Sequence, residues 1–205
     1  MTRSVGRPRD SALNQTIADA VREVLAEKGY AQLTVDAVAR RAGVGKAAIY
    51  RRHTTKQRMI FASVMHDLEL APPPDTGSLV ADLAAVTLNI AEILAGPPPG
   101  VVPALLADVH TDESMAAAFS GSLVKAERDC LIEVLERAMA RGELSRLPDL
   151  ATVHAMLLGP IFAWLFLLLE ERERIPALCE ALAESTARTL LAGGCDDLRP
   201  RDFPA

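Results

Sequence analysis

Apolar side chains recur every three or four positions along most of the chain, which is the period of a helix with one buried side. No segment alternates apolar and polar residues over the length of a strand. The sequence therefore predicts an all-α fold of about nine helices. The first helix is expected to end near Lys28, because a glycine follows its apolar positions: Leu13, Ile17, Val21, Val24 and then Gly29.

The next segment predicts two short helices joined by a tight turn. Thr34 precedes an apolar stretch that ends before Gly43, so its hydroxyl is expected to cap the free N–H groups of the second helix. The glycines at positions 43 and 45 then predict a turn into a third helix, residues 46–53. Two short helices with such a turn form a helix-turn-helix unit, whose second helix enters the major groove of DNA.

Glycine and proline clusters divide the remaining chain into further helices. Thr54, with Gln57 three residues later, has the pattern of a capping box and predicts the start of a fourth helix. Within the long helix predicted at 112–141, Ser120-Gly121-Ser122 is expected to be a weak point. The later helices are expected at residues 78–95, 103–110, 112–141, 150–171 and 176–191.

The segment 150–169 is apolar on nearly every side of its helix. Its longest apolar run, Ala155 to Leu169, has 15 residues and includes Gly159-Pro160, where we expect a kink. Because about 20 apolar residues are needed to cross a bilayer, we expect a buried helix and no membrane partner. An apolar helix of this kind is costly to expose in a monomer, so a second copy of the chain is expected to cover it.

The formal net charge of −5 conceals a strong asymmetry. Residues 1–60 hold 12 Lys and Arg against 5 Asp and Glu, whereas residues 61–205 hold 10 against 22. A basic first segment on an acidic remainder is typical of a protein that binds a polyanion with one part only. The cysteines lack C-x-x-C spacing and the first residues lack the apolar stretch of a signal peptide, so we expect a cytoplasmic protein.

The third predicted helix carries the residues that would contact DNA. Its Ile49, together with Val38, Ala39 and Val44, has the spacing expected to hold the helix-turn-helix together. Four residues are expected to read bases: Lys46, Ala47, Ala48 and Arg51. The full set offers hydrogen-bond donors, small apolar surface for thymine methyls and a tyrosine ring: Lys46, Ala47, Ala48, Tyr50, Arg51 and Arg52.

Cations on either side of this unit extend the expected contact surface. Lys56 and Arg58 stand in the first turn of the fourth helix, where a cation is unfavourable unless a phosphate binds the free N–H groups. The Thr55 hydroxyl would add a hydrogen bond to that phosphate. Ahead of the first helix, Arg7 and Arg9 belong to a basic arm that we expect to lie along a narrow minor groove.

The segment TVDAVARRAGVGKAAIYRRHTTK, Thr34 to Lys56, combines these features. On its strength, residues 13–65 resemble the DNA-binding domain of the TetR family of transcriptional regulators. The resemblance implies that Thr34 caps the second helix and touches a phosphate. It also implies that Tyr50 is the tyrosine of the recognition helix and that Lys56 is the lysine that opens the fourth helix.

Two positions depart from the family pattern. Gly45 stands where the family usually has Ser or another capping residue, and His53 stands where it usually has Phe. The glycine lacks a side chain for one phosphate contact, and the histidine puts a titratable ring in place of an apolar anchor. Both positions stay among the expected DNA contacts.

The resemblance also implies a helical regulatory body. The segments RGEL at 141–144 and LLGPIF at 157–162 are similar to a subgroup in which the last two long helices of two subunits form a four-helix dimer interface. Here these are the helices at about 150–171 and 176–191. Such a body is expected to bind a small, largely apolar effector between its helices, with these candidate lining residues: Asn89, His110, Phe119, His154, Phe162 and Trp164.

The sequence thus predicts a DNA-binding transcriptional repressor that binds a palindromic operator as a homodimer and is released by a small molecule. We expect no metal, no cofactor and no catalytic residue, because neither ligand spacing nor paired carboxylates occur. The alternatives are an activator, a helical ligand-binding dimer without DNA binding, and an α-helical enzyme. The expected organisation is a flexible basic arm (1–10), a helix-turn-helix domain (11–57), a regulatory and dimerisation domain (58–193) and a disordered tail (194–205).

Overall fold

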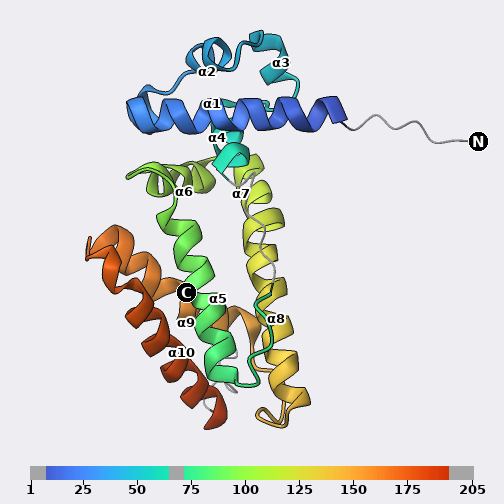
Figure 1. Ribbon diagram of the computed structural model, residues 1–205, viewed down its shortest axis with the longest axis vertical. Coiled ribbons are helices and arrows are strands. Elements are labelled where there is room, and N and C mark those ends of the chain that lie inside the picture. The colour runs from blue at the N-terminus through green and yellow to red at the C-terminus, as the bar shows by residue number, and fades with distance from the viewer. Residues whose placement is uncertain (1–7, 65–71, 194–205) are drawn as a thin grey trace, which may run out of the picture. The chain divides into compact units, whose positions relative to one another are not determined.

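The computed structural model describes residues 8–64 and 72–193, with side chains from residue 11 onward (Figure 1). Every regular element within these ranges is helical, which confirms the all-α prediction. Because α7, the π-helical turn η1 and α8 are continuous, and α9 continues into the π-helical turn η2, the described residues form nine helices, as expected. The elements are α1 (Pro8–Gln32), α2 (Val35–Ala42), α3 (Lys46–Tyr50), α4 (Lys56–Val64), α5 (Leu79–Ala95), α6 (Val101–Thr111), α7 (Glu113–Phe119), η1 (Ser120–Val124), α8 (Lys125–Ala140), α9 (Leu150–Phe162), η2 (Ala163–Leu167), the short 3-10 turn η3 (Arg172–Arg174) and α10 (Ile175–Leu191).

The chain divides into two compact units. The first unit, residues 1–68 with 97–120, contains α1 to α4 together with α6 and α7. The second unit, residues 69–96 with 121–205, contains α5, α8, α9 and α10. The helices α6 and α7 therefore belong to the same compact unit as the helix-turn-helix, although they come much later in the sequence.

The core of the first unit joins the helix-turn-helix to α1. Val38 and Ile49 are fully buried, Ala39 is nearly so, and Val44 packs against this core from the turn. The prediction that these four residues hold α2 and α3 together is confirmed. Burying one side of α3 in this way leaves its other side exposed.

The end of α1 and the limits of α2 follow the sequence signals. Helix α1 begins at Pro8, and Gly29 leaves the helical conformation with φ 72° and ψ 176°, which confirms the expected stop near Lys28. The Thr34 Oγ1 accepts a hydrogen bond of 3.2 Å from the Ala37 N–H and caps α2 as expected. Gly43 ends α2 in the left-handed conformation, with φ 66°.

The predicted start of α4 is one residue too early. The cap is Thr55, whose Oγ1 accepts a hydrogen bond of 3.1 Å from the Arg58 N–H, so the capping box of Thr54 with Gln57 is wrong. The physical reason is that α3 ends already at Tyr50, not at His53, and the residues after it form turns that delay the next helix. Position 58 then holds an arginine, which has no acceptor for the return bond.

The second unit is built around α5, which packs against α8, α9 and α10 (Figure 1). Each of these helices contributes buried apolar side chains, among them Leu83, Leu131, Leu157 and Ala183. The stretch Leu150–Leu167, with a mean hydropathy of 1.9, is apolar and long enough to cross a membrane by length and composition only. The core helix of a soluble protein passes the same test, but only 28% of this stretch is buried inside the described chain, so the prediction of a buried helix is wrong for the chain taken alone.

Two π-helical turns interrupt the long helices. The weak point predicted at Ser120-Gly121-Ser122 is confirmed, because η1 begins at Ser120. The helix that contains Pro160 continues into η2, where the Leu168 N–H bonds to the Ala163 carbonyl at 2.8 Å. It ends before Leu169, which has a positive φ of 54°, so the predicted end near Glu171 is wrong.

Arg141, directly after α8, joins distant segments of the second unit. Its guanidinium nitrogens lie 3.0 Å from Asp82, 2.5 Å from Asp75 and 2.6 Å from Glu143. Asp82 is fully buried and also accepts hydrogen bonds of 2.9 and 2.6 Å from the N–H and hydroxyl of Thr76. Burial alone would raise the pKa of Asp82, but the bonds from Thr76 and Arg141 outweigh it and lower the pKa. The first residues of the RGEL segment thus fix the turn after α8 to the start of α5.

Candidate nucleic-acid interface

The exposed side of α3 carries most of the side chains predicted to meet DNA. Lys46, Ala47 and Arg51 are exposed, and 52% of the Tyr50 side chain is accessible although Ile49 beside it is fully buried. Ala48 is half-buried. One buried residue thus anchors a short helix whose other positions present cations, methyl groups and a phenol to solvent. These groups are suited to base and phosphate contacts in a major groove.

Lys46 forms an ion pair on the same surface. Its Nζ lies 2.6 Å from Asp36 Oδ1, and both side chains are more than half exposed. An ion pair this exposed contributes little free energy, so a phosphate or a guanine edge can replace the carboxylate. The pair also keeps the carboxylate of Asp36 next to a cation when no DNA is bound.

Thr34 and Gly45 stand at the starts of the two helices. Thr34 is exposed, and its hydroxyl oxygen accepts the capping bond, so the hydroxyl proton can still be donated to a phosphate. Gly45 occupies the cap position of α3 with φ −73° and ψ 144°, and no side chain bonds the first N–H groups of that helix. The departure from the family at Gly45 therefore leaves α3 without a side-chain cap.

The two adjacent arginines of the interface differ in their surroundings. Arg51 is exposed, whereas Arg52 is half-buried and donates hydrogen bonds of 2.9 Å to the Asn14 side chain and 3.2 Å to the Ala48 carbonyl. Arg52 thereby links α3 to α1. Of the two, Arg51 is the side chain that reaches solvent most freely.

His53 is half-buried at the end of the helix-turn-helix. Burial is the main cause that lowers its pKa, and the neighbouring Arg52 and Arg58 lower it further. The imidazole is therefore neutral at neutral pH. A half-buried imidazole thus stands at the position where the resemblance predicts a phenylalanine.

Lys56 makes two contacts with one residue that the sequence did not single out. Its Nζ donates a hydrogen bond of 3.3 Å to the Tyr30 carbonyl and lies 5.3 Å from the centre of the Tyr30 ring. The Tyr30 hydroxyl in turn donates to Asp108 on α6. The sequence offered no signal for this arrangement, because Tyr30, Lys56 and Asp108 come from three separate helical segments. Arg7 lies outside the described residues, as does the side chain of Arg9.

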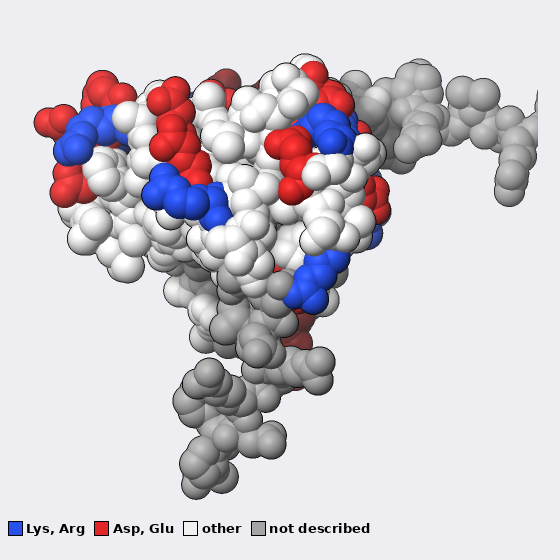
Figure 2. All heavy atoms as spheres, turned by 90° about the horizontal axis from the view of Figure 1, so that it is seen from below, with Lys and Arg blue, Asp and Glu red and all other residues white. Residues whose placement is uncertain are grey.

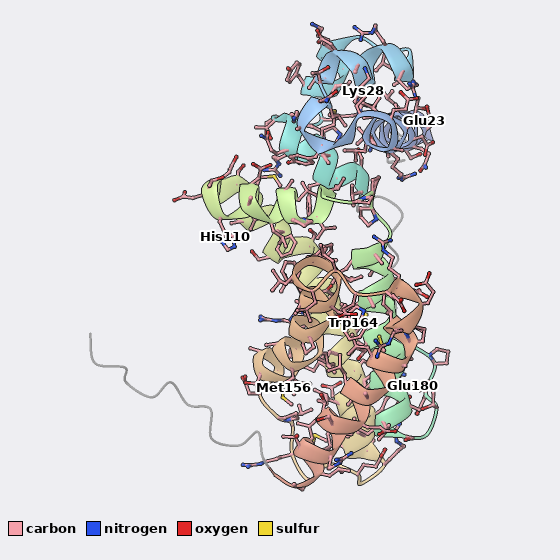
Figure 3. The ribbon with its side chains drawn as sticks, turned by 90° about the vertical axis from the view of Figure 1, so that its left-hand side faces the viewer. Glu23, Lys28, His110, Met156, Trp164 and Glu180 are labelled. Atoms are coloured by element: carbon pink, nitrogen blue, oxygen red, sulfur yellow. The ribbon has the colours of Figure 1, made fainter. Side chains whose placement is uncertain are left out.

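The six candidate effector residues do not form one group. His110 and Phe119 belong to the first unit, where Figure 3 shows His110 at the surface and Phe119 packs 6.0 Å from Phe61 between ring centres. The others belong to the second unit. There His154 is buried and lies 2.9 Å from the buried Glu127 between α8 and α9. The remaining three are half-buried: Asn89, Phe162 and Trp164.

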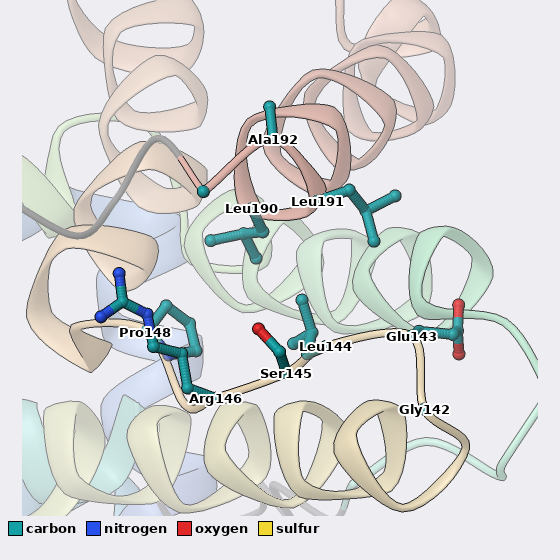
Figure 4. A pocket seen from close by; sticks show the side chains of 10 residues that line it. Gly142, Glu143, Leu144, Ser145, Arg146, Pro148, Leu190, Leu191 and Ala192 are labelled. Atoms are coloured by element: carbon teal, nitrogen blue, oxygen red, sulfur yellow. The ribbon is translucent and has the colours of Figure 1, made fainter.

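The second unit has a pocket of about 470 Å³ at another place. It lies between the loop after α8 and the last turn of α10, with Leu144, Leu190 and Leu191 as its apolar part and Glu143 and Arg146 among its polar residues (Figure 4). None of the six predicted effector residues lines it. Among the described side chains, no group of three or more His, Cys, Asp or Glu is arranged to hold a metal ion.

Charged side chains are mixed on the face of the molecule drawn in Figure 2. Acidic and basic groups of the described residues lie close to one another there, separated by uncharged atoms. No continuous basic patch is visible among them on that face. It therefore differs from the exposed side of the recognition helix, where the exposed charged residues are the cations Lys46 and Arg51.

The fold and this surface define a class of protein. A helix-turn-helix whose second helix is anchored by one buried isoleucine and exposes cations is the architecture of a DNA-binding regulator. Residues 17–62 match the family described as bacterial regulatory proteins, tetR family, and residues 73–186 match the tetracyclin repressor-like C-terminal domain. The chain belongs to the TetR family of transcriptional regulators.

Individual relatives match long parts of the chain. The chain is 33% identical over 158 residues to the HTH-type transcriptional regulator YdeS of Bacillus subtilis, covering 77% of this chain and 80% of YdeS. It is 31% identical over 134 residues to the DNA-binding transcriptional repressor TetR of Mycobacteroides abscessus, covering 64% of this chain and 70% of that protein. The crystal structure of the TetR family regulator SCO0332 has a TM-score of 0.67 at 26% identity, covering 89% of this chain and 98% of that structure. These comparisons confirm the expected family and fold.

Proposed function

We propose that the protein is a cytoplasmic repressor that binds a palindromic operator as a homodimer and leaves it when a small molecule binds. The observation that carries the proposal is the exposure of Lys46 and Tyr50 on α3 and of Arg51 directly after it, while Ile49 anchors the helix in the core. In a dimer, two such helices would enter successive major grooves about 34 Å apart. The repressor named among the relatives supports repression over activation.

Each contact in this proposal has a specific task. Four residues read base edges: Lys46, Ala47 and Ala48, exposed or half-buried at the start and middle of α3, and Arg51, exposed directly after its last residue. The other predicted contacts bind the phosphates and so position the protein on the DNA. Hydroxyls, cations and the free N–H groups of α4 are suited to binding phosphate oxygens. These other contacts are Thr34, Gly45, Tyr50, Arg52, His53, Thr55, Lys56, Arg7 and Arg9.

The dimer would form through α9 and α10. These helices pack against each other and face the viewer in Figure 3, with Met156 on α9, Trp164 beyond it and Glu180 on α10. The small residues Ala151, Ala155 and Gly159 are exposed along α9 although they lie in its apolar stretch. A second copy of the same helix pair would cover this surface as in a four-helix interface.

The effector would bind in the second unit and act on the spacing of the two recognition helices. We keep the polar and aromatic residues Asn89, His154, Phe162 and Trp164 as candidate contacts there. His110 and Phe119 stay candidates within the first unit and belong to no common site with them. A coupling free energy of about 1–3 kcal/mol would change operator affinity 5- to 150-fold. By linkage, DNA would weaken effector binding by the same factor.

The test begins with DNA. Fragments bound by the purified protein are selected from a random pool, and the recovered operator is used in electrophoretic shift assays with Arg51→Ala. We expect a loss of about 5- to 150-fold, equivalent to the 1–3 kcal/mol of one base contact. Arg128→Ala removes the same charge from an exposed position on α8 and serves as the matched control.

Two results would contradict the proposal. Unchanged affinity of Arg51→Ala would remove that residue from the interface. Failure of the wild-type protein to retain any DNA would favour a helical ligand-binding dimer without DNA binding. Small molecules are then screened for release of the operator, which tests the effector separately.

A further inference from the structure

Tyr30 lies at an unusual place in the first unit. Gly29 before it has φ 72° and ψ 176°, a conformation almost confined to glycine, and this ends the regular course of α1. Carbonyl groups at the end of a helix lack an intrahelical partner. The Tyr30 carbonyl receives its hydrogen bond from the side chain of Lys56, at 3.3 Å.

The same lysine lies over the face of the tyrosine ring. The Lys56 Nζ is 5.3 Å from the ring centre, within the range in which a cation is attracted to an aromatic face. An ammonium group has three protons, so the bond to the carbonyl leaves two for an anion. The backbone and the ring of one residue therefore hold Lys56 at the start of α4 without using up its donors.

The tyrosine ring is itself held from the other side. Its hydroxyl donates a hydrogen bond to the Asp108 carboxylate on α6. Burial, followed by this bond and the negative charge of Asp108, raises the pKa of Tyr30, so the hydroxyl stays protonated and remains a donor. Asp108, Tyr30 and Lys56 thus form a chain of contacts from α6 to the start of α4.

We propose that Tyr30 is a positioning residue for DNA binding: held by Asp108, it places the Lys56 ammonium group where a phosphate of the operator meets the start of α4. This inference rests on the proposed function, because it assumes that Lys56 contacts DNA. Tyr30 itself does not touch DNA in this arrangement. The ordering of a flexible lysine before DNA arrives lowers the entropy lost on binding.

A double-mutant cycle separates this role from a structural one. Operator affinity is measured for the wild-type protein, Tyr30→Leu, Lys56→Ala and the double variant. Tyr30→Leu is expected to weaken binding about two- to fivefold, the range of a cation–π contact at a partly exposed site. In the Lys56→Ala background, the same change is expected to have no further effect.

Milder variants keep the test valid if Tyr30→Leu does not fold. Tyr30→Phe retains the ring and loses only the hydroxyl, and Asp108→Asn removes the carboxylate charge that orients it. Both are expected to weaken binding less than Tyr30→Leu and, again, only when Lys56 is present. Glu113→Gln, which removes a charge from an exposed position on α7, corrects for the general effect of fewer acidic groups.

The outcomes distinguish the two hypotheses. An equal loss from the Tyr30 variants with and without Lys56 would overturn the positioning role, as would unchanged affinity of all of them. Lys56→Ala is expected to weaken binding to all sequences and to reduce the salt slope by about one. If Lys56→Ala kept both affinity and slope while Arg51→Ala lost binding, the positioning role would fail and the proposed function would stand.

Discussion

Adding a side chain at Gly45 is expected to change both the stability of the fold and the affinity for the operator. It caps α3 in an extended conformation, and a Cβ added there would have no heavy atom within 4 Å. Gly45→Ser is therefore expected to stabilise the fold by a few tenths of a kcal/mol, since serine caps better than glycine by about that amount. The new hydroxyl would also donate to a phosphate, so operator affinity should rise.

Gly45→Ala is the control, because it adds a Cβ and no hydroxyl. Chemical denaturation measures the stability of both variants, and shift assays measure their operator affinity. Tighter binding by Gly45→Ser and not by Gly45→Ala would support the missing phosphate contact. Equal binding by the two variants would mean that no phosphate lies within reach of this position.

The sequence predicted which residues of the proposed interface are exposed, but not the hydrogen bonds that hold their side chains. Thr34, Lys46 and Arg51 are exposed as expected, because an apolar anchor at Ile49 determines which side of a short helix faces solvent. The bonds of Arg52 to Asn14 and of Lys56 to Tyr30 were not predictable. They depend on the way α1 crosses the later helices, and no local pattern records that crossing.

At the scale of the elements, the Arg141 contacts make a prediction about the turn after α8. Arg141→Gln removes the charge next to the buried Asp82 and is expected to lower the free energy of unfolding by about 3 kcal/mol, the lower end for breaking a buried pair. Arg137→Gln is the comparison, because Arg137 lies one turn earlier and forms its ion pair with the half-exposed Glu133. This variant should lower the free energy of unfolding by less than Arg141→Gln does.

The same variant should change the dependence of stability on pH. The pKa of Asp82 is lowered in the folded protein, so its contribution is present above the ordinary pKa of about 3.8 and is lost as the pH falls through the lowered value. As the pH is lowered from 7 to 3, the free energy of unfolding measured by denaturation should therefore decrease less steeply for Arg141→Gln than for the wild-type protein. Parallel curves would show that Arg141 does not lower this pKa.

Helix limits were predictable where a local signal decides them. Thr34, Gly29 and Gly43 act through their own backbone or side chain, and the sequence placed all three correctly. The start of α4 was misplaced because Thr54 and Thr55 are both competent caps, and the choice depends on where α3 ends. The end of η2 was misplaced because apolar residues continue beyond it to Leu169.

At the scale of the whole molecule, the exposed side of α9 predicts an oligomer. Ala155→Glu would place a carboxylate in the proposed dimer interface, where an unpaired buried charge costs several kcal/mol. Sedimentation is expected to give a dimer for the wild-type protein and a monomer for this variant. Ala117→Glu, an exposed position on α7, is the matched control and should remain dimeric.

A wild-type protein that sediments as a monomer would contradict the proposed interface. So would an Ala155→Glu variant that stays dimeric with normal stability. The sequence predicted the need for a covering surface from apolarity alone, and the low burial of Leu150–Leu167 agrees with it. The grouping of α6 and α7 with the first unit was not predictable, because it depends on contacts between residues far apart in the chain.

Trp164 gives this protein a built-in optical reporter. It is the one tryptophan of the sequence. Its indole N–H donates a hydrogen bond of 3.1 Å to the Glu171 carbonyl, and the guanidinium of Arg174 lies over the ring, 5.2 Å from its centre. All tryptophan emission therefore originates at η2, beside the turn that leads to α10. Its wavelength, and its quenching by added iodide, are expected to change if the proposed dimer forms near this residue or the proposed effector binds there, so both proposals can be followed without any attached dye.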